Sequence, residues 1–92
     1  MTSVTHTVNL NRQQQETAII AMEEMAELTQ VLSKLIRFGY TPEKRVNLIQ
    51  EIGDVRCMIE LLHNTFGLLY NDTDEAMQDK QIKLMTWSKL YE

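Results

Sequence analysis

The segment AIIAMEEMAELTQVLSKL, residues 18–35, decides the fold of this chain. Its apolar residues recur every three or four positions, which is the spacing of a helix that buries one face. With about 100° of rotation per residue, Glu24 falls inside the apolar stripe, Glu27 lies about 60° away at its edge, and Glu23 lies at its margin. The segment therefore predicts a long helix that carries acidic side chains on the face that meets the core.

A second segment, QEIGDVRCMIELL at residues 50–62, repeats this arrangement. Glu51 and Asp54 lie one helical turn apart, with apolar side chains around them on the helical wheel. Burying a lone carboxylate costs several kcal/mol, and carboxylates held close together also repel one another. A bound cation resolves both problems, and ligands that are all oxygen favour a hard cation such as Mg²⁺. We therefore predict a metal site formed by Glu24, Glu27, Glu51 and Asp54.

Local signals bound the first helix. Residues 1–9 are polar and rich in Ser and Thr, and we expect them to form a loose arm. Asn11 and Gln14 have the spacing of a capping box, so the helix begins there. It runs to about Phe38, and Gly39 is a natural residue to end it.

Two further helices follow. Thr41 is a good N-cap and Pro42 a good first helical residue, so the second helix begins there and is predicted to reach about Tyr70, with Gly67 as the point where it could falter. The next capping signature begins at Asp72, which places the third helix at about residues 73–90. There is no signal for a β-strand, a repeat or a low-complexity tract. The expected fold class is all-α.

Apolar side chains cover more than one face of the first helix. Ile19 and Met22 lie well away from the stripe that contains Glu24. Gly53 is unusual inside a helix, and we expect another helix to pack closely against it. Because three helices of one chain cannot cover all these faces, we predict a homo-oligomer, dimer or tetramer, in which helices of two chains complete four-helix-bundle units.

Composition indicates one globular domain, residues 1–92. The chain is 43% hydrophobic and 24% charged, and its net charge of −4 disfavours nucleic acid or a membrane surface as the main partner. No apolar run approaches the roughly 18 residues of a membrane span. Cys57 is a single cysteine, and residues 1–7 lack the layout of a signal peptide. We expect a cytoplasmic protein.

The two acidic segments, Glu23-Glu24-Met25-Ala26-Glu27 and Glu51-Ile52-Gly53-Asp54, together resemble a family signature. Glu-Glu-x-x-Glu followed, after a spacer, by Glu-x-x-Asp is similar to the motif of the MazG-like, all-α nucleoside triphosphate pyrophosphohydrolases. The resemblance extends over residues 13–69. It implies Mg²⁺-dependent cleavage between the α- and β-phosphates of a nucleoside triphosphate, with Mn²⁺ as an alternative metal.

The resemblance also implies roles for individual residues. Glu24, Glu27, Glu51 and Asp54 would be the metal ligands, and Glu23 would be an auxiliary catalytic acid that orients the attacking water. Members of the family commonly form dimers or dimers of dimers. One divalent cation cannot neutralise four carboxylates, so the site needs more than one metal, or lysines. We expect substrate phosphates to contact Lys34, Lys80 and Lys83.

Other interpretations of these residues stay open. Lys34 could be a surface lysine whose stem covers apolar groups, and Asn47 could reach the substrate or stay on the surface. Glu60 and His63 have the spacing used in di-iron bundles, but they lie off the acidic stripe. The alternative functions are a non-catalytic helical interaction module with a structural cation, and a phosphoribosyl-ATP pyrophosphohydrolase.

Overall fold

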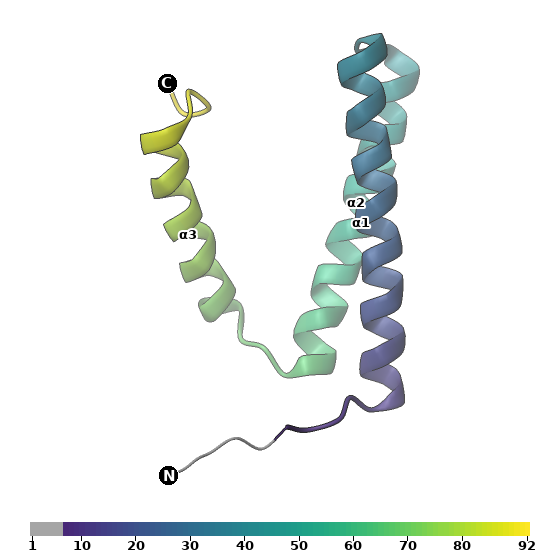
Figure 1. Ribbon diagram of the computed structural model, residues 1–92, viewed down its shortest axis with the longest axis vertical. Coiled ribbons are helices and arrows are strands. Elements are labelled where there is room, and N and C mark those ends of the chain that lie inside the picture. Colours follow the sequence, from purple (N-terminus) through teal and green to yellow (C-terminus); the bar gives the residue numbers. More distant parts are fainter. Residues whose placement is uncertain (1–6) are drawn as a thin grey trace.

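The computed structural model describes residues 7–92. Three α-helices follow one another: α1, Arg12–Phe38; α2, Pro42–Phe66; and α3, Tyr70–Trp87. The described residues contain no strand, so the all-α class is confirmed. Figure 1 shows α1 and α2 side by side as an antiparallel hairpin, with α3 standing apart from it. No helix in this part of the chain has both the length and the apolar composition to cross a membrane.

The capping box at the start of α1 is present. The backbone N–H of Gln14 donates to Asn11 Oδ1 at 2.8 Å, and the backbone N–H of Asn11 donates to Gln14 Oε1 at 3.0 Å. These two bonds satisfy backbone donors that a helix start leaves free. At the other end, Gly39 has a φ of 85°, which favours glycine, and its N–H donates to the carbonyl of Leu35 at 2.9 Å.

The predicted start of α2 is also confirmed. Thr41 Oγ1 accepts the backbone N–H of Lys44 at 3.2 Å, and Pro42 is the first helical residue. The predicted end at about Tyr70 is wrong, because α2 stops at Phe66, but the interruption expected at Gly67 is present. Gly67 takes the left-handed conformation, with φ at 63°, and the N–H of Leu68 donates to the His63 carbonyl at 2.9 Å.

The predicted start of α3 is wrong as well. The helix begins at Tyr70, and Leu69 occupies the N-cap position without a side-chain hydrogen bond. Asp72 therefore lies in the first turn, where its charge is favourable at the positive end of the helix. At the other end α3 stops at Trp87, before residue 90. Ser88 has extended backbone angles, and its hydroxyl donates to the carbonyl of Leu84 at 2.9 Å.

The contact surface between α1 and α2, here called the seam, follows the spacing of the apolar stripe. Near the open end of the hairpin, Gln14 Nε2 donates to the carbonyl of Thr65 at 3.1 Å. The buried hydrophobic residues of the described chain are Ala21 and Met58 only. The half-buried residues along the seam include Glu24, Leu28, Val31 and Leu35 on α1, and Lys44, Leu48, Glu51 and Val55 on α2.

This narrow seam leaves much apolar surface exposed within one chain. Met22 is 62% exposed, Met85 66% and Trp87 84%. A Cβ added at Gly53 would have no neighbouring atom within 4 Å. Within the described chain, the prediction that another helix packs closely against Gly53 is therefore wrong. Exposed apolar surface on this scale is typical of a protein that associates with another chain.

His63 connects the end of α2 to the start of α3. It is buried, and its Nδ1 donates to the carbonyl of Ile59 at 2.9 Å. Its Nε2 lies 2.8 Å from Thr73 Oγ1, and its ring stacks on Tyr70 with centroids 4.3 Å apart. This buried contact fixes the direction in which α3 leaves the hairpin.

We predict that His63 and Thr73 are energetically coupled. His63→Phe keeps the stacked ring but removes the hydrogen bond, and Thr73→Val removes it from the other side. In a double-mutant cycle followed by urea denaturation, the coupling free energy should be about 0.5–1.5 kcal/mol. Strictly additive effects would show that the contact does not hold α3.

Candidate metal centre

The four predicted metal ligands lie on facing sides of the hairpin. Glu24 and Glu27 come from α1, and Glu51 and Asp54 come from α2. One carboxylate oxygen from each of Glu24, Glu51 and Asp54 lies within 4.8 Å of the other two. We call the four predicted ligands, Glu24, Glu27, Glu51 and Asp54, the acid cluster. The antiparallel pairing of two helices with the same periodicity brings together residues that are far apart in sequence.

Two oxygen atoms of the acid cluster are enclosed. Glu24 and Glu51 are half-buried, whereas Glu27 and Asp54 are exposed. Glu24 Oε2 and Glu51 Oε2 are buried atoms without a hydrogen-bond partner. Buried polar atoms in proteins nearly always have a partner, so these two acceptors need either a proton or a cation.

The environment of the cluster changes the acidity of both half-buried residues. Burial raises the pKa of Glu24 above its ordinary value, and the negative charges of Glu27, Asp54 and Glu51 raise it further. Burial also raises the pKa of Glu51, with added repulsion from Glu27 and Asp54. The charge of Glu27 thus acts on both Glu24 and Glu51. Oxygen donors gathered at high negative charge fit a hard divalent cation such as Mg²⁺ or Mn²⁺.

A cavity of about 380 Å³ opens beside the acid cluster, on the side of the turn between α1 and α2. Its wall contains Glu27 and Glu51 from the cluster and the basic residues Lys34 and Lys44. The remaining lining residues are Gln30, Val31, Asn47 and Gln50. The cavity therefore places carboxylates, ammonium groups and amides around one space, which suits a ligand that carries phosphate groups.

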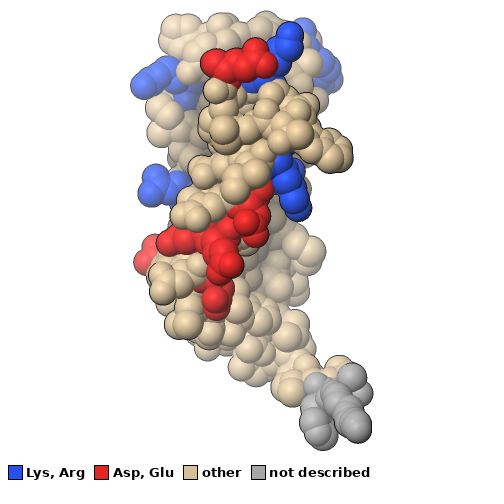
Figure 2. Space-filling view, turned by 90° about the vertical axis from the view of Figure 1, so that its left-hand side faces the viewer, with Lys and Arg blue, Asp and Glu red and all other residues tan. Residues whose placement is uncertain are grey.

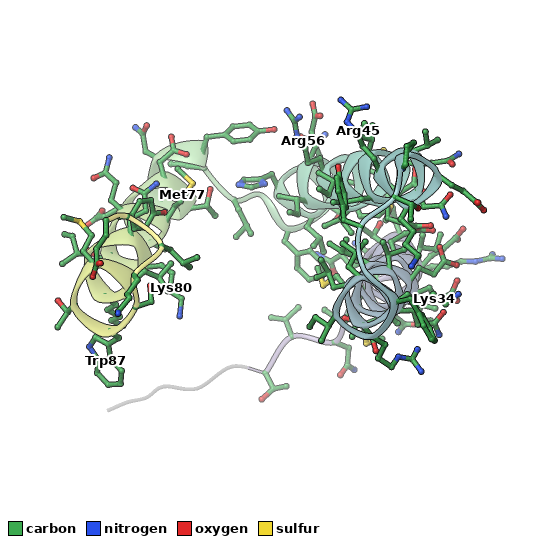
Figure 3. All side chains as sticks on the ribbon, turned by 90° about the horizontal axis from the view of Figure 1, so that it is seen from above. Lys34, Arg45, Arg56, Met77, Lys80 and Trp87 are labelled. Carbon is green, nitrogen blue, oxygen red and sulfur yellow. The ribbon has the colours of Figure 1, made fainter. Side chains whose placement is uncertain are left out.

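The predicted substrate contacts divide into two groups. Lys34 shares the cavity with Glu27 and Glu51. Lys80 and Lys83 line a separate, smaller cavity of about 150 Å³ on α3, together with Leu84 and Trp87. Figure 3 shows Lys34 on the hairpin and Lys80 on the separated α3. The described chain thus does not bring Lys80 and Lys83 to the acid cluster.

Glu23 and the acids of α3 have different surroundings from the acid cluster. Glu23 is exposed and is not among the residues that line the cavity. Figure 2 shows acidic side chains gathered where the N-terminal half of α3 lies. The acids in that half are Asp72, Asp74 and Glu75, and Asp79 follows just past the midpoint of the helix; all four are exposed. Exposed carboxylates keep their hydration and need no cation, so α3 carries a solvated acidic face.

Lys44, Gln30 and Gln50 were not predicted as site residues. A signal for Lys44 was present in the sequence, because it lies two helical turns before Glu51 just as Lys34 lies two turns after Glu27. Asn47, which was left open, lines the cavity. The amides of Gln30 and Gln50 gave no comparable signal, since glutamine is common on solvated helix faces.

The spacing of Glu60 and His63 does not produce a second metal centre here. Both ring nitrogens of His63 are engaged, with the Ile59 carbonyl and with the Thr73 hydroxyl. Glu60 lines a different hollow, which it shares with Gly53 and Tyr70. His63 is therefore a structural residue of the α2–α3 junction.

Comparison with known proteins adds no assignment, since no family model, no curated protein and no solved structure matches this chain. The resemblance to the MazG-like family stays a prediction from the two acidic motifs. The function is therefore inferred from the geometry of the acid cluster and its cavity.

We predict that the metal-free protein becomes more stable as the pH falls from neutral towards 4.5, the ordinary pKa of these side chains. Glu24 and Glu51 have raised pKa values, so the folded state binds their protons more tightly than the unfolded state does. The destabilisation is fully present above the folded-state pKa and disappears as the pH falls through it. Melting temperatures in a chelating buffer measure this.

Two variants locate the origin of that pH dependence. Glu51→Gln should weaken it, because it removes a titrating member of the cluster. Glu60→Gln should leave it unchanged, because Glu60 is exposed and lies outside the cluster. Equal pH profiles for the original protein and Glu51→Gln would show that the cluster does not control stability.

Proposed function

We propose that this chain is a Mg²⁺-dependent nucleotide pyrophosphohydrolase of the MazG-like kind, which cleaves a nucleoside triphosphate to a monophosphate and pyrophosphate. The observation that carries the proposal is the pair of enclosed, unpartnered oxygens of Glu24 and Glu51 beside a cavity lined by lysines. A purely structural acidic face would keep its carboxylates hydrated. Here one oxygen of Glu24 and one of Glu51 are removed from water, next to a space large enough for phosphate groups.

The acid cluster would hold the cation through Glu24, Glu27, Glu51 and Asp54. A bound divalent cation supplies a Lewis acid that neutralises phosphate charge and activates water. Four carboxylates exceed the charge of one such ion, which favours more than one metal in the working site. In this proposal Glu23, which is exposed on α1 next to Glu24 in the sequence, would accept a hydrogen bond from the attacking water and orient it.

The three lysines proposed to bind the substrate phosphates lie on different helices. Lys34 reaches them within the hairpin cavity. Lys80 and Lys83 lie on α3, which stands apart from α1 and α2 (Figure 1). They would approach the acid cluster only if α3 changed its position or came from a second copy of the chain. Their role in substrate binding therefore depends on the assembly.

The alternatives differ in what they require of the cavity. A non-catalytic module with a structural cation would need the acid cluster but not the basic wall beside it, so Lys34 and Lys44 favour the enzyme. A phosphoribosyl-ATP pyrophosphohydrolase would need additional basic contacts for its second phosphate-bearing ribose. Pyrophosphate release from a panel of ribo- and deoxynucleoside triphosphates, with and without Mg²⁺, separates all three. Absence of release from every compound would overturn the enzymatic proposal.

We predict that Glu51→Gln lowers pyrophosphohydrolase activity by about a hundredfold or more, because it removes one charge from the metal site while keeping the shape of the side chain. Stability without metal should be maintained or increased, because repulsion among the carboxylates is relieved. Steady-state pyrophosphate release and thermal melting measure the two effects.

The matched control is Glu60→Gln, the same substitution on the same helix outside the acid cluster. It should leave activity within about twofold of the original. Full activity in Glu51→Gln, or loss of activity only in Glu60→Gln, would place the metal site elsewhere.

We predict that millimolar Mg²⁺ raises the melting temperature, since the acid cluster exists only in the folded state and binding to that state alone stabilises it. Asp54→Asn should reduce this shift. Scanning calorimetry with added Mg²⁺ or Mn²⁺ measures it, and Asp79→Asn serves as a control in the solvated acids of α3. An unchanged melting temperature in the original protein would contradict a metal site.

The proposal includes a cytoplasmic homo-oligomer, dimer or tetramer, that covers the exposed apolar faces. We predict a particle mass in light scattering of two or four times the chain mass of 10.8 kDa. Trp87→Lys should lower that mass at equal concentration, because it places a charge on the most exposed large apolar side chain of α3. A 10.8 kDa particle at working concentration would show that one chain stands alone.

A further inference from the structure

The cavity beside the acid cluster has two basic residues whose positions mirror each other. Lys34 lies seven residues after Glu27 on α1, and Lys44 lies seven residues before Glu51 on α2. Seven residues are about 10 Å along a helix, and both steps lead towards the turn at Gly39. All four side chains line the same cavity. Its wall therefore changes from acidic to basic in the direction of the turn.

Lys44 is held in position by the protein. It is half-buried in the seam, and its Nζ donates to the carbonyl of Gly39 at 3.0 Å. The same Nζ lies 5.3 Å from the centroid of the Phe38 ring, within the range of a cation–π contact. An ammonium group has three donors, and this hydrogen bond uses one of them. Two donors remain for a ligand, on a side chain that loses little further freedom when it binds.

We propose that Lys34 and Lys44 form an anion subsite that holds the terminal phosphates of the substrate and the pyrophosphate that leaves. The choice of ligand rests on the proposed function. Cleavage between the α- and β-phosphates leaves two phosphate groups whose charge the acid cluster and its cation do not balance. Lys34 and Lys44 are the cations that line the same cavity as Glu27 and Glu51. The amides of Gln30, Asn47 and Gln50 supply further donors on the same wall.

A simpler role for Lys44 would be to bind the carbonyl of Gly39, the residue that follows α1, and hold the turn. That role requires a hydrogen-bond donor near Gly39 but not a second lysine on the facing helix. It also predicts no effect of Lys34 on anion binding. The two roles are separated by removing charge at each position and measuring anion binding directly, independently of catalysis.

The test is calorimetric titration of inorganic pyrophosphate into the full chain saturated with Mg²⁺. Lys34→Gln and Lys44→Gln should each weaken pyrophosphate binding by about tenfold, and the double variant by about a hundredfold, since each change removes one positive charge that donates a hydrogen bond to the anion. Lys44→Arg should retain most of the affinity because it keeps the charge. Binding of Mg²⁺ alone should stay within about twofold in every variant.

Arg45→Gln is the matched control. It removes a positive charge from the residue next to Lys44, but Arg45 is exposed and points away from α1 (Figure 3). Pyrophosphate affinity should stay within about twofold of the original. An equal loss in Arg45→Gln would mean that overall charge, not a subsite, controls binding and would overturn the proposal. Original affinity in Lys34→Gln and Lys44→Gln would overturn it as well.

The outcomes also separate this subsite from the proposed function. If no nucleoside triphosphate is hydrolysed but pyrophosphate binding depends on both lysines, the subsite stands and the enzymatic function does not. If hydrolysis occurs and neither lysine affects pyrophosphate binding, the function stands and the subsite does not. Should Lys44→Gln fail to fold by circular dichroism, Lys34→Gln and Lys44→Arg still decide the result, because the subsite requires loss in the first and retention in the second.

Discussion

The approach of Glu24 and Glu51 across the seam is the constraint on which the rest of the structure depends. These residues occupy positions where a helical hairpin normally places leucine or valine, and each carries an enclosed oxygen without a partner. Repulsion and lost hydration work against the pairing of α1 and α2 at this point. The apolar residues on either side, including Ala21 and Met58, hold the helices together despite it. The pairing of α1 and α2 therefore places two acceptor oxygens without a hydrogen-bond partner inside its own packing surface.

Sequence reasoning predicted the parts of the molecule that depend on local or periodic signals. The capping box at Asn11 and the cap at Thr41 form because their hydrogen bonds join residues three apart, and such bonds can be inferred from spacing alone. The acid cluster was inferred for a related reason. Once Glu24 and Glu51 fall on the apolar faces of two consecutive helices, antiparallel pairing brings those faces together.

The position of α3 depends on contacts that have no periodic signal. The capping signature at Asp72 predicted a start at about residue 73. Instead, α3 begins at Tyr70, because Gly67 ends α2 in the left-handed conformation. His63 on α2 then binds Thr73 on α3 across the junction between the two helices. The capping preference for a start at Asp72 contributes about 1 kcal/mol. It is outweighed by the two hydrogen bonds of the buried His63 ring. The location of Lys80 and Lys83 relative to the acid cluster followed from this junction and could not be predicted.

The narrow seam also connects the candidate site to the state of assembly. A wider apolar interface between α1 and α2 would stabilise one chain alone, but it would enclose the carboxylates completely and close the cavity beside them. With the interface as it is, Glu27 and Asp54 remain accessible to an incoming cation, while Met22, Met85 and Trp87 remain uncovered. In the proposed assembly, the stability that the narrow seam does not supply would come from a cation at the acid cluster or from a second chain on the apolar faces. Those two sources would act on different surfaces, so coverage of the apolar faces would keep the protein folded when metal and ligand leave.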